Sequence, residues 1–206
     1  MSFLMLGNTF TSAMTGNTAL LAIAIGQGQL VSALLSFLAL VGFVCGVALA
    51  TTIYNPGKGL ARTVLRPLFA LEVVCLGGFV AAWHFVDRQS QSFGLDALIL
   101  LSATAMGVQA VVARHINAPG VNTIVFTSTL VAIVMSVTGA LARPSLHPSV
   151  GRNTLRQIGI FLAYALGGLC AAFLAWRHIP VIQWIPFVAV LAAIICCELT
   201  LPANKG

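Results

Sequence analysis

The chain has 206 residues, of which 59% are hydrophobic and only 7% are charged. A soluble domain carries about 25% charged residues, so ten Lys and Arg and four Asp and Glu cannot cover a water-facing surface. This composition excludes a soluble domain and, because apolar residues run along the whole length, a secreted protein with one signal peptide. The net charge of +6 reflects the scarcity of acids and forms no basic stripe, so no nucleic-acid partner is expected.

Seven apolar blocks follow one another along the chain. A spanning helix needs about 20 apolar residues, and the blocks approach or meet this length. Short connections rich in Gly, Pro and Asn separate them and read as loops. We therefore predict one transmembrane domain over 1–206, an all-α bundle of six or seven segments in the lipid bilayer. The blocks cover 1–25, 30–53, 65–86, 95–113, 119–142, 157–176 and 180–201.

The first and fifth blocks are not ordinary spans. The first polar segment, Gly7–Thr18, and the second polar segment, Pro119–Thr129, are both rich in Asn, Thr, Ser and Gly. About ten purely apolar residues follow each of them. Polar backbone is tolerated at membrane depth where it is buried in protein or lines a wet cavity. We expect both segments to be broken or re-entrant.

The two polar segments predict an internal duplication. Thr15-Gly16 aligns with Thr127-Ser128, 112 positions later, and the blocks that follow also correspond. The first repeat then covers about 1–86 and the second about 95–201. The partner of block 95–113 falls before residue 1, so the first repeat lacks its first helix. Either the start of the chain is placed too late or this copy is truncated.

The charges between the blocks bear on the topology. If all seven blocks cross the membrane, five positive residues lie on each side, although such proteins normally show a bias. If the fifth block enters and leaves on one side, eight positive residues gather there against two. If the first block also enters and leaves on one side, each complete repeat has three crossings. Because this number is odd, the two repeats are inverted relative to each other. The eight are Lys58, Arg62, Arg66, Arg114, Arg143, Arg152, Arg156 and Lys205.

The polar segments supply the first candidate pathway residues. A half-helix that starts at such a segment aims free N–H groups and a positive dipole end into the protein. The alternative is that small and hydroxyl residues only let helices pack closely. The candidates for a solute or ion pathway are Thr11, Thr15, Gly16, Asn17, Thr18, Pro119, Gly120, Asn122, Thr123, Thr127 and Ser128.

Two further polar residues lie inside apolar blocks. Glu72 is the only acid well inside a block, where a charge costs about 2.5–3.5 kcal/mol on insertion scales. Such a carboxyl is a candidate proton carrier, or else it is bonded to a neighbouring helix or lies near the interface. Gln109 is a candidate to bond the second polar segment, or else makes one interhelical hydrogen bond.

No enzyme, metal or cofactor signature is present. The sequence has no nucleophile elbow, phosphate-binding loop or zinc-protease motif. The four histidines share no face, so a metal site is not expected. We expect a protein without enzymatic activity and without a cofactor.

The polar segments also resemble those of a known family, the YoaK-like small bacterial membrane proteins, a family of unknown function. The resemblance rests on Phe10–Thr18, Ala105–Gln109, Pro119–Thr123, Phe126–Leu130 and Leu71-Glu72, and covers nearly the whole chain. It implies a multi-pass protein of the bacterial cytoplasmic (inner) membrane and adds no activity. Two departures are the absent earlier helix with its Gly-x-x-Asp-type segment and Gln109-Ala110 where Gln-Asn is usual.

These observations leave two hypotheses from different classes. The first is a small permease for a solute or ion, with the two polar segments meeting near the midplane beside Glu72 and Gln109. The second is a membrane protein that transports nothing and acts by packing against partner proteins or lipids. Both hypotheses allow the protein to form a homo-oligomer. Transport predicts polar segments that face a wet cavity, whereas packing predicts hydroxyls bonded to backbone carbonyls.

Overall fold

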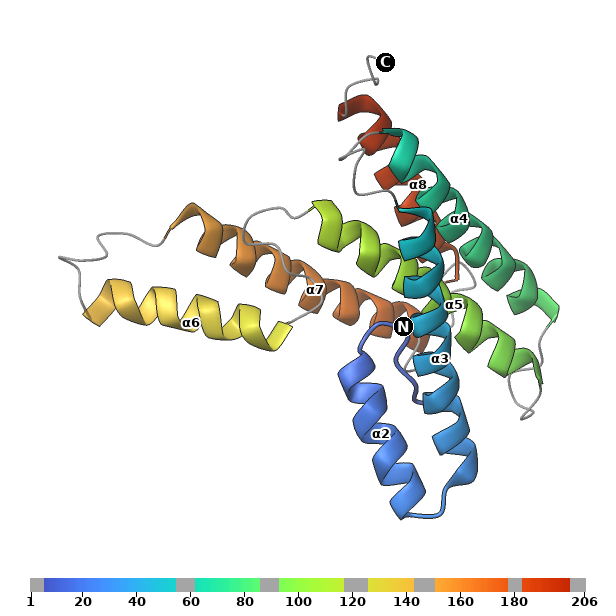
Figure 1. Cartoon of the computed structure of the whole chain (residues 1–206). Coiled ribbons are helices and arrows are strands. Elements are labelled where there is room, and N and C mark those ends of the chain that lie inside the picture. Colours follow the sequence, from blue (N-terminus) through green and yellow to red (C-terminus); the bar gives the residue numbers. More distant parts are fainter. Residues whose placement is uncertain are drawn as a thin grey trace.

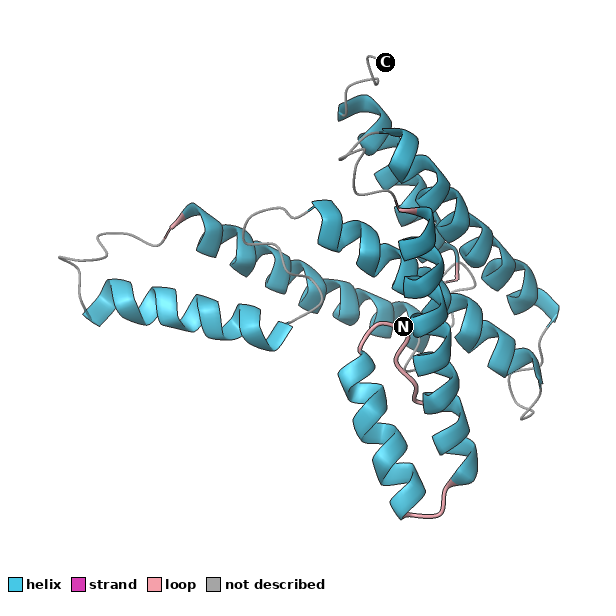
Figure 2. Ribbon diagram, viewed as in Figure 1, coloured by secondary structure: helices cyan, strands magenta, loops and turns pink. Residues whose placement is uncertain are grey.

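The computed structural model describes residues 6–54, 62–85, 93–116, 126–142, 151–177 and 183–200. Within these ranges every regular element is a helix and no strand occurs (Figure 2). The all-α prediction is thus confirmed for this part of the chain. The helices are α2 (Met14–Gly26), α3 (Leu30–Ile53), α4 (Arg62–Phe85), α5 (Phe93–Ile116), α6 (Phe126–Ala142), α7 (Arg152–Trp176) and α8 (Trp184–Thr200).

Four of these helices are long and apolar enough to cross a membrane: Leu30–Ile53, Val64–Phe85, Gly94–Arg114 and Arg152–Trp176. Three shorter apolar helices accompany them. Two of the short ones, α2 and α6, begin within the two polar segments, at Met14 and Phe126, and continue through the apolar residues that follow. The predicted blocks 1–25 and 119–142 are therefore helical in their second halves within the described residues.

The helices α3, α4 and α5 form the centre of the molecule, with α8 beside α4 and α2 folded back along α3 (Figure 1). The pair α6 and α7 extends away from this centre, and none of the α7 spanning window is buried. One hydrogen bond of 2.8 Å, from the Thr154 hydroxyl to the Ser136 hydroxyl, joins α7 to α6. The bundle core is thus made by the first four described helices and α8.

The closest helix contact joins α3 to α5 at glycines. A Cβ atom on Gly42 would lie 2.9 Å from the Leu100 carbonyl oxygen, and one on Gly46 would overlap the Thr104 carbonyl oxygen. Gly107 meets the Phe43 carbonyl in the same way. Small residues let helix backbones approach this closely, which is how helices associate in lipid. The Thr104 hydroxyl also donates to the Gly42 carbonyl at 3.1 Å.

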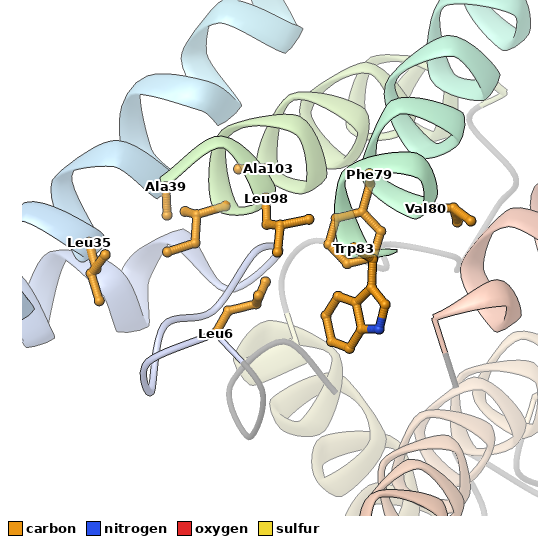
Figure 3. Packing of buried hydrophobic residues seen from close by; sticks show 9 residues of the cluster. Leu6, Leu35, Ala39, Phe79, Val80, Trp83, Leu98 and Ala103 are labelled. Carbon is orange, nitrogen blue, oxygen red and sulfur yellow. The ribbon is translucent and has the colours of Figure 1, made fainter. Parts of the chain in front are cut away.

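Apolar side chains extend this contact to α4 (Figure 3). Leu35 and Ala39 of α3, Phe79 and Trp83 of α4 and Leu98 of α5 belong to one buried cluster. A second cluster joins α4 to the later part of α5, and a third brings in Val190 of α8. Together they hold α4 along its whole length against α5.

We predict that Gly46→Leu destabilises the protein strongly. The new side chain must push α3 away from the Thr104 carbonyl of α5, because backbone cannot move aside as a flexible side chain does. The expected loss is about 3 kcal/mol or more, measured as a lower thermal unfolding midpoint in detergent.

The matched control is Gly167→Leu in α7, where no atom lies within 4 Å of an added Cβ. This variant is expected to change stability by no more than about 0.5 kcal/mol. Equal shifts for the two variants would contradict the close α3–α5 contact.

Candidate functional site

The first polar segment begins as irregular backbone packed into the bundle. Gly7 has φ +62° and Asn8 has φ 59°, a left-handed conformation that Gly and Asn adopt most readily. A Cβ on Gly7 would lie 2.6 Å from Leu35 Cδ1 of α3. Leu6, beside it, is 1% exposed and belongs to the cluster shared by α3, α4 and α5 (Figure 3). This backbone is therefore anchored in the protein interior.

Asn17 holds the irregular segment to the first turns of α2. Its side chain is fully buried, its Oδ1 accepts from the Phe10 N–H at 3.0 Å and its Nδ2 donates to the Phe10 carbonyl at 2.5 Å. One amide side chain thus satisfies both backbone groups of Phe10, as a neighbouring strand would. The Phe10 ring covers Gly16, where a Cβ would lie 3.1 Å from the ring. We call this arrangement, Phe10 with Gly16 and Asn17, the Asn17 clamp.

The threonines of the segment fall into two groups. Thr9 and Thr11 are buried, and the Thr9 hydroxyl donates to the Gly7 carbonyl at 3.4 Å. Thr15 and Thr18 lie on the exposed side of α2, where the Thr18 hydroxyl donates to the Met14 carbonyl at 3.0 Å. The segment therefore offers hydroxyl groups on a face that the rest of the described protein leaves open.

The N-terminus of α2 lacks a side-chain cap. Ala13 precedes the helix and makes no capping hydrogen bond, and the first turn contains no acidic residue. The first backbone N–H groups of a helix have no partner within the helix itself. This end of α2 thus presents donors and a positive dipole end beside Thr15.

Glu72 lies in the middle of α4 and is 2% exposed. It shares one helical face with Leu68, one turn before it, and with Cys75 and Leu76, one turn after it. These neighbours pack against α5 in the second and third clusters. No hydrogen bond or ion pair from another described residue reaches the Glu72 carboxyl. Glu72 is thus buried in the protein interior, and no partner is found in the described part of the chain.

A cavity of about 210 Å³ lies between α4 and α8. Arg66 and Glu198 stand at this cavity and form a two-point ion pair, with Nε to Oε1 at 2.8 Å and Nη2 to Oε2 at 3.0 Å. The two side chains are 64% and 34% exposed, so water weakens the attraction. The remaining lining residues are Leu65, Phe69, Ala70, Ile194 and Cys197.

The other predicted site residues are placed only in part. Gln109 lies on an exposed position of α5, and no hydrogen bond joins it to Glu72 or to the described residues of the first polar segment. Thr127 and Ser128 belong to the first turn of α6, while their side chains lie outside the description. Outside the described residues altogether are Pro119, Gly120, Asn122 and Thr123. The meeting of the two polar segments therefore stays a prediction.

Two features of the site could not be seen from the sequence. The ion pair joins residues 132 positions apart, and nothing in either neighbourhood points to the other. The Asn17 clamp could not be predicted from the sequence either, because an Asn in a polar segment is as compatible with a ligand contact as with a structural one. Among the described residues, no group of three or more His, Cys, Asp or Glu is placed to hold a metal ion.

Comparison with known proteins gives two matches. Residues 1–197 match the family described as "Protein of unknown function (DUF1275)". The chain is also similar to the UPF0700 transmembrane protein YoaK of Bacillus subtilis (strain 168), with 28% identity over 204 residues. That alignment covers 98% of this chain and 89% of the relative. No solved structure matches this chain.

The resemblance expected from the polar segments and Leu71-Glu72 is confirmed by these matches. The relative is named a transmembrane protein, which agrees with the apolar helices described above. The chain is therefore a helical membrane protein and belongs to the DUF1275 family of proteins of unknown function.

Proposed function

We propose that this protein is a small permease that moves a solute or an ion across a membrane. The observation that carries the proposal is the start of α2: a short helix packed on α3 begins directly after irregular polar backbone, and its N-terminus has no side-chain cap. Transporters bind substrates at such discontinuous helices, where free N–H groups face the pathway. The proposal includes no enzymatic step.

The length of α2 supports a start near the middle of the membrane. Its 13 residues rise about 20 Å, while the 24 residues of α3 rise about 36 Å. The two helices are joined by the short turn Gln27–Gln29 and pack against each other (Figure 1). Counting back from this turn, Met14 lies at about the level of Gly42, halfway along α3.

The second repeat supports the same reading. Helix α6 begins at Phe126, 112 positions after the start of α2 at Met14, which is the offset between the two polar segments. Helix α6 also packs against α7, as α2 packs against α3. We propose two diverged repeats in a single domain, each with one broken or re-entrant segment.

The proposed setting is the cytoplasmic membrane of a bacterium, with the chain crossing several times. It is supported by the bacterial transmembrane relative and by the four long apolar helices. The lipid bilayer and the transported solute or ion are the proposed partners, and a second copy of the chain is a further candidate.

We predict that cysteines placed at Thr15 and Thr18 react with a charged, water-soluble thiol reagent in intact liposomes. A permease needs water at this face, and both positions are exposed on α2. The experiment starts from a chain without its native cysteines, which are Cys45, Cys75, Cys170, Cys196 and Cys197. Labelling is followed by the mass added to the protein.

The matched control is a cysteine at Val74, which is 69% exposed on α4. This side chain faces lipid in the proposed setting, so it stays unlabelled although nothing in the protein covers it. A cysteine at Gln27, in the turn after α2, reports reagent access. Labelling at Gln27 with none at Thr15 or Thr18 would rule out a water pathway along this face.

The second candidate, a membrane protein that acts by packing, is favoured by the Asn17 clamp. Both polar ends of the Asn17 side chain are used by the Phe10 backbone. Several hydroxyls are also bonded to carbonyls, among them those of Thr18 and Thr51. In this view the polar segment stabilises an irregular backbone and binds nothing.

We predict that Asn17→Ala lowers the free energy of unfolding by about 1–3 kcal/mol, because the part-buried N–H and carbonyl of Phe10 lose their hydrogen bonds to Asn17. Thr18→Val is the matched control, since its exposed hydroxyl bonds only within its own helix, and a change within about 0.5 kcal/mol is expected. Both are measured by thermal unfolding in detergent. Equal stability of Asn17→Ala and the unaltered chain would contradict the clamp.

A further inference from the structure

The Glu72 side chain is buried near the middle of α4. Glu72 is the eleventh of 24 residues in α4, which places it about 15 Å from the start of the helix. Its 2% exposure leaves no direct contact with the outside. An ionisable side chain at this depth usually faces the bundle interior and carries a function.

The surroundings of Glu72 are apolar on every packed helix. Leu68 and Leu76 flank it on α4, and Ala105 and Val108 belong to the α5 side of the same clusters. On α5 no titratable residue lies between Asp96 and Arg114. Besides Asp96 and Arg114 on α5, the described titratable or charged groups on α4 and the helices packed against it fall into three sets. They are Arg66, Cys75 and His84 on α4, Cys45 on α3 with Tyr54 directly after it, and Cys196, Cys197 and Glu198 on α8.

Of these groups, Cys75 is the buried neighbour of Glu72, one turn along the same face. Arg66 lies six positions earlier, is exposed and is held by Glu198. No described cation is therefore placed to neutralise the Glu72 carboxyl.

The groups around Glu72 determine which kind of ion its carboxyl can bind. A hard metal cation such as Mg²⁺ or Ca²⁺ takes six or more oxygen ligands, and the described neighbours of Glu72 supply none. On α5, the Thr104 hydroxyl already donates to the Gly42 carbonyl. A proton requires a single carboxylate oxygen. Among ions, the proton is the one that these residues can hold.

The α4–α8 cavity lies close to Glu72 in sequence and packing, although Glu72 does not itself line it. It holds about 210 Å³, enough for several waters at roughly 30 Å³ each. Phe69 lines it one helical turn before Glu72, and Ile194 lines it and packs against the cluster that contains Cys75. Arg66 and Glu198 lie at its polar end.

We propose that Glu72 binds and releases a proton, and that water in the α4–α8 cavity connects its carboxyl to the surface beside Arg66 and Glu198. The purpose of this proton, to drive transport, rests on the proposed function. The binding of the proton does not.

The test is labelling with dicyclohexylcarbodiimide, an apolar reagent that adds to protonated carboxyls inside membranes. The full chain is reconstituted in phosphatidylcholine liposomes, treated with the reagent and digested, and the labelled peptide is identified by mass spectrometry. We expect the label on Glu72, its complete loss in Glu72→Gln and its retention in Glu198→Gln. Above the titration midpoint the labelling rate falls about tenfold for each pH unit.

Glu72→Asp is the control for the case in which Glu72→Gln fails to fold. It keeps a carboxyl at the same place, so its labelling is retained while that of Glu72→Gln is lost. An unlabelled Glu72 in the folded chain at all pH values, or labelling that does not change with pH, overturns proton binding. This outcome is independent of the thiol labelling at Thr15 and Thr18, whose failure would overturn the permease and leave the proton site standing.

The route is tested by hydrogen–deuterium exchange of the same carboxyl, followed through its infrared carbonyl band as the difference between the unaltered chain and Glu72→Gln. Ala70→Trp fills the cavity, which Ala70 lines, and is expected to slow the exchange several-fold. Ala172→Trp, on the exposed face of α7, is the matched control and leaves the rate unchanged. Equal rates in the two tryptophan variants overturn the cavity as the route.

Discussion

The contact of α3 with α5 through Gly42, Gly46 and Gly107 is the constraint on which the rest of this structure depends. Lipid tails are as apolar as leucine, so helices in a membrane gain nothing from hiding apolar surface and associate through close packing. Here the glycines make close packing possible, because carbonyl groups of one helix can touch the backbone of the other. The pair then provides two fixed surfaces, one for α2 on α3 and one for α4 on α5.

The placement of the polar residues follows from this pair. Leu6 fills the corner where α3, α4 and α5 meet, which holds the irregular backbone of the first polar segment at its depth. The Asn17 clamp then sets where α2 can begin. Glu72 lies on the face of α4 that packs against α5, together with its apolar neighbours. Helix packing therefore positions Glu72, while the start of α2 is positioned by the irregular segment before it and the contacts of that segment with the helices.

Much of the helix layout could be predicted from the sequence, because apolar length alone marks a spanning helix. The block 30–53 coincides with α3, and the interior position of Glu72 followed from its place within a block. Contacts between distant positions could not be predicted. Gly42 and Gly46 are two among 19 glycines, and only the fold shows that these meet the α5 backbone whereas Gly167 meets nothing. The hydrogen bonds between the Asn17 side chain and the Phe10 backbone likewise could not be predicted, because they depend on how the chain folds.

The comparison of α4 with α7 bears on what Glu72 is for. The α7 spanning window has no buried residues, yet exposure of its apolar side chains costs little in lipid. Burial of a carboxyl among apolar groups does cost free energy, and here no bond from another described residue offsets it. A leucine at this position would pack without that cost. Stability therefore does not account for the acid, whereas the proton binding proposed for Glu72 would.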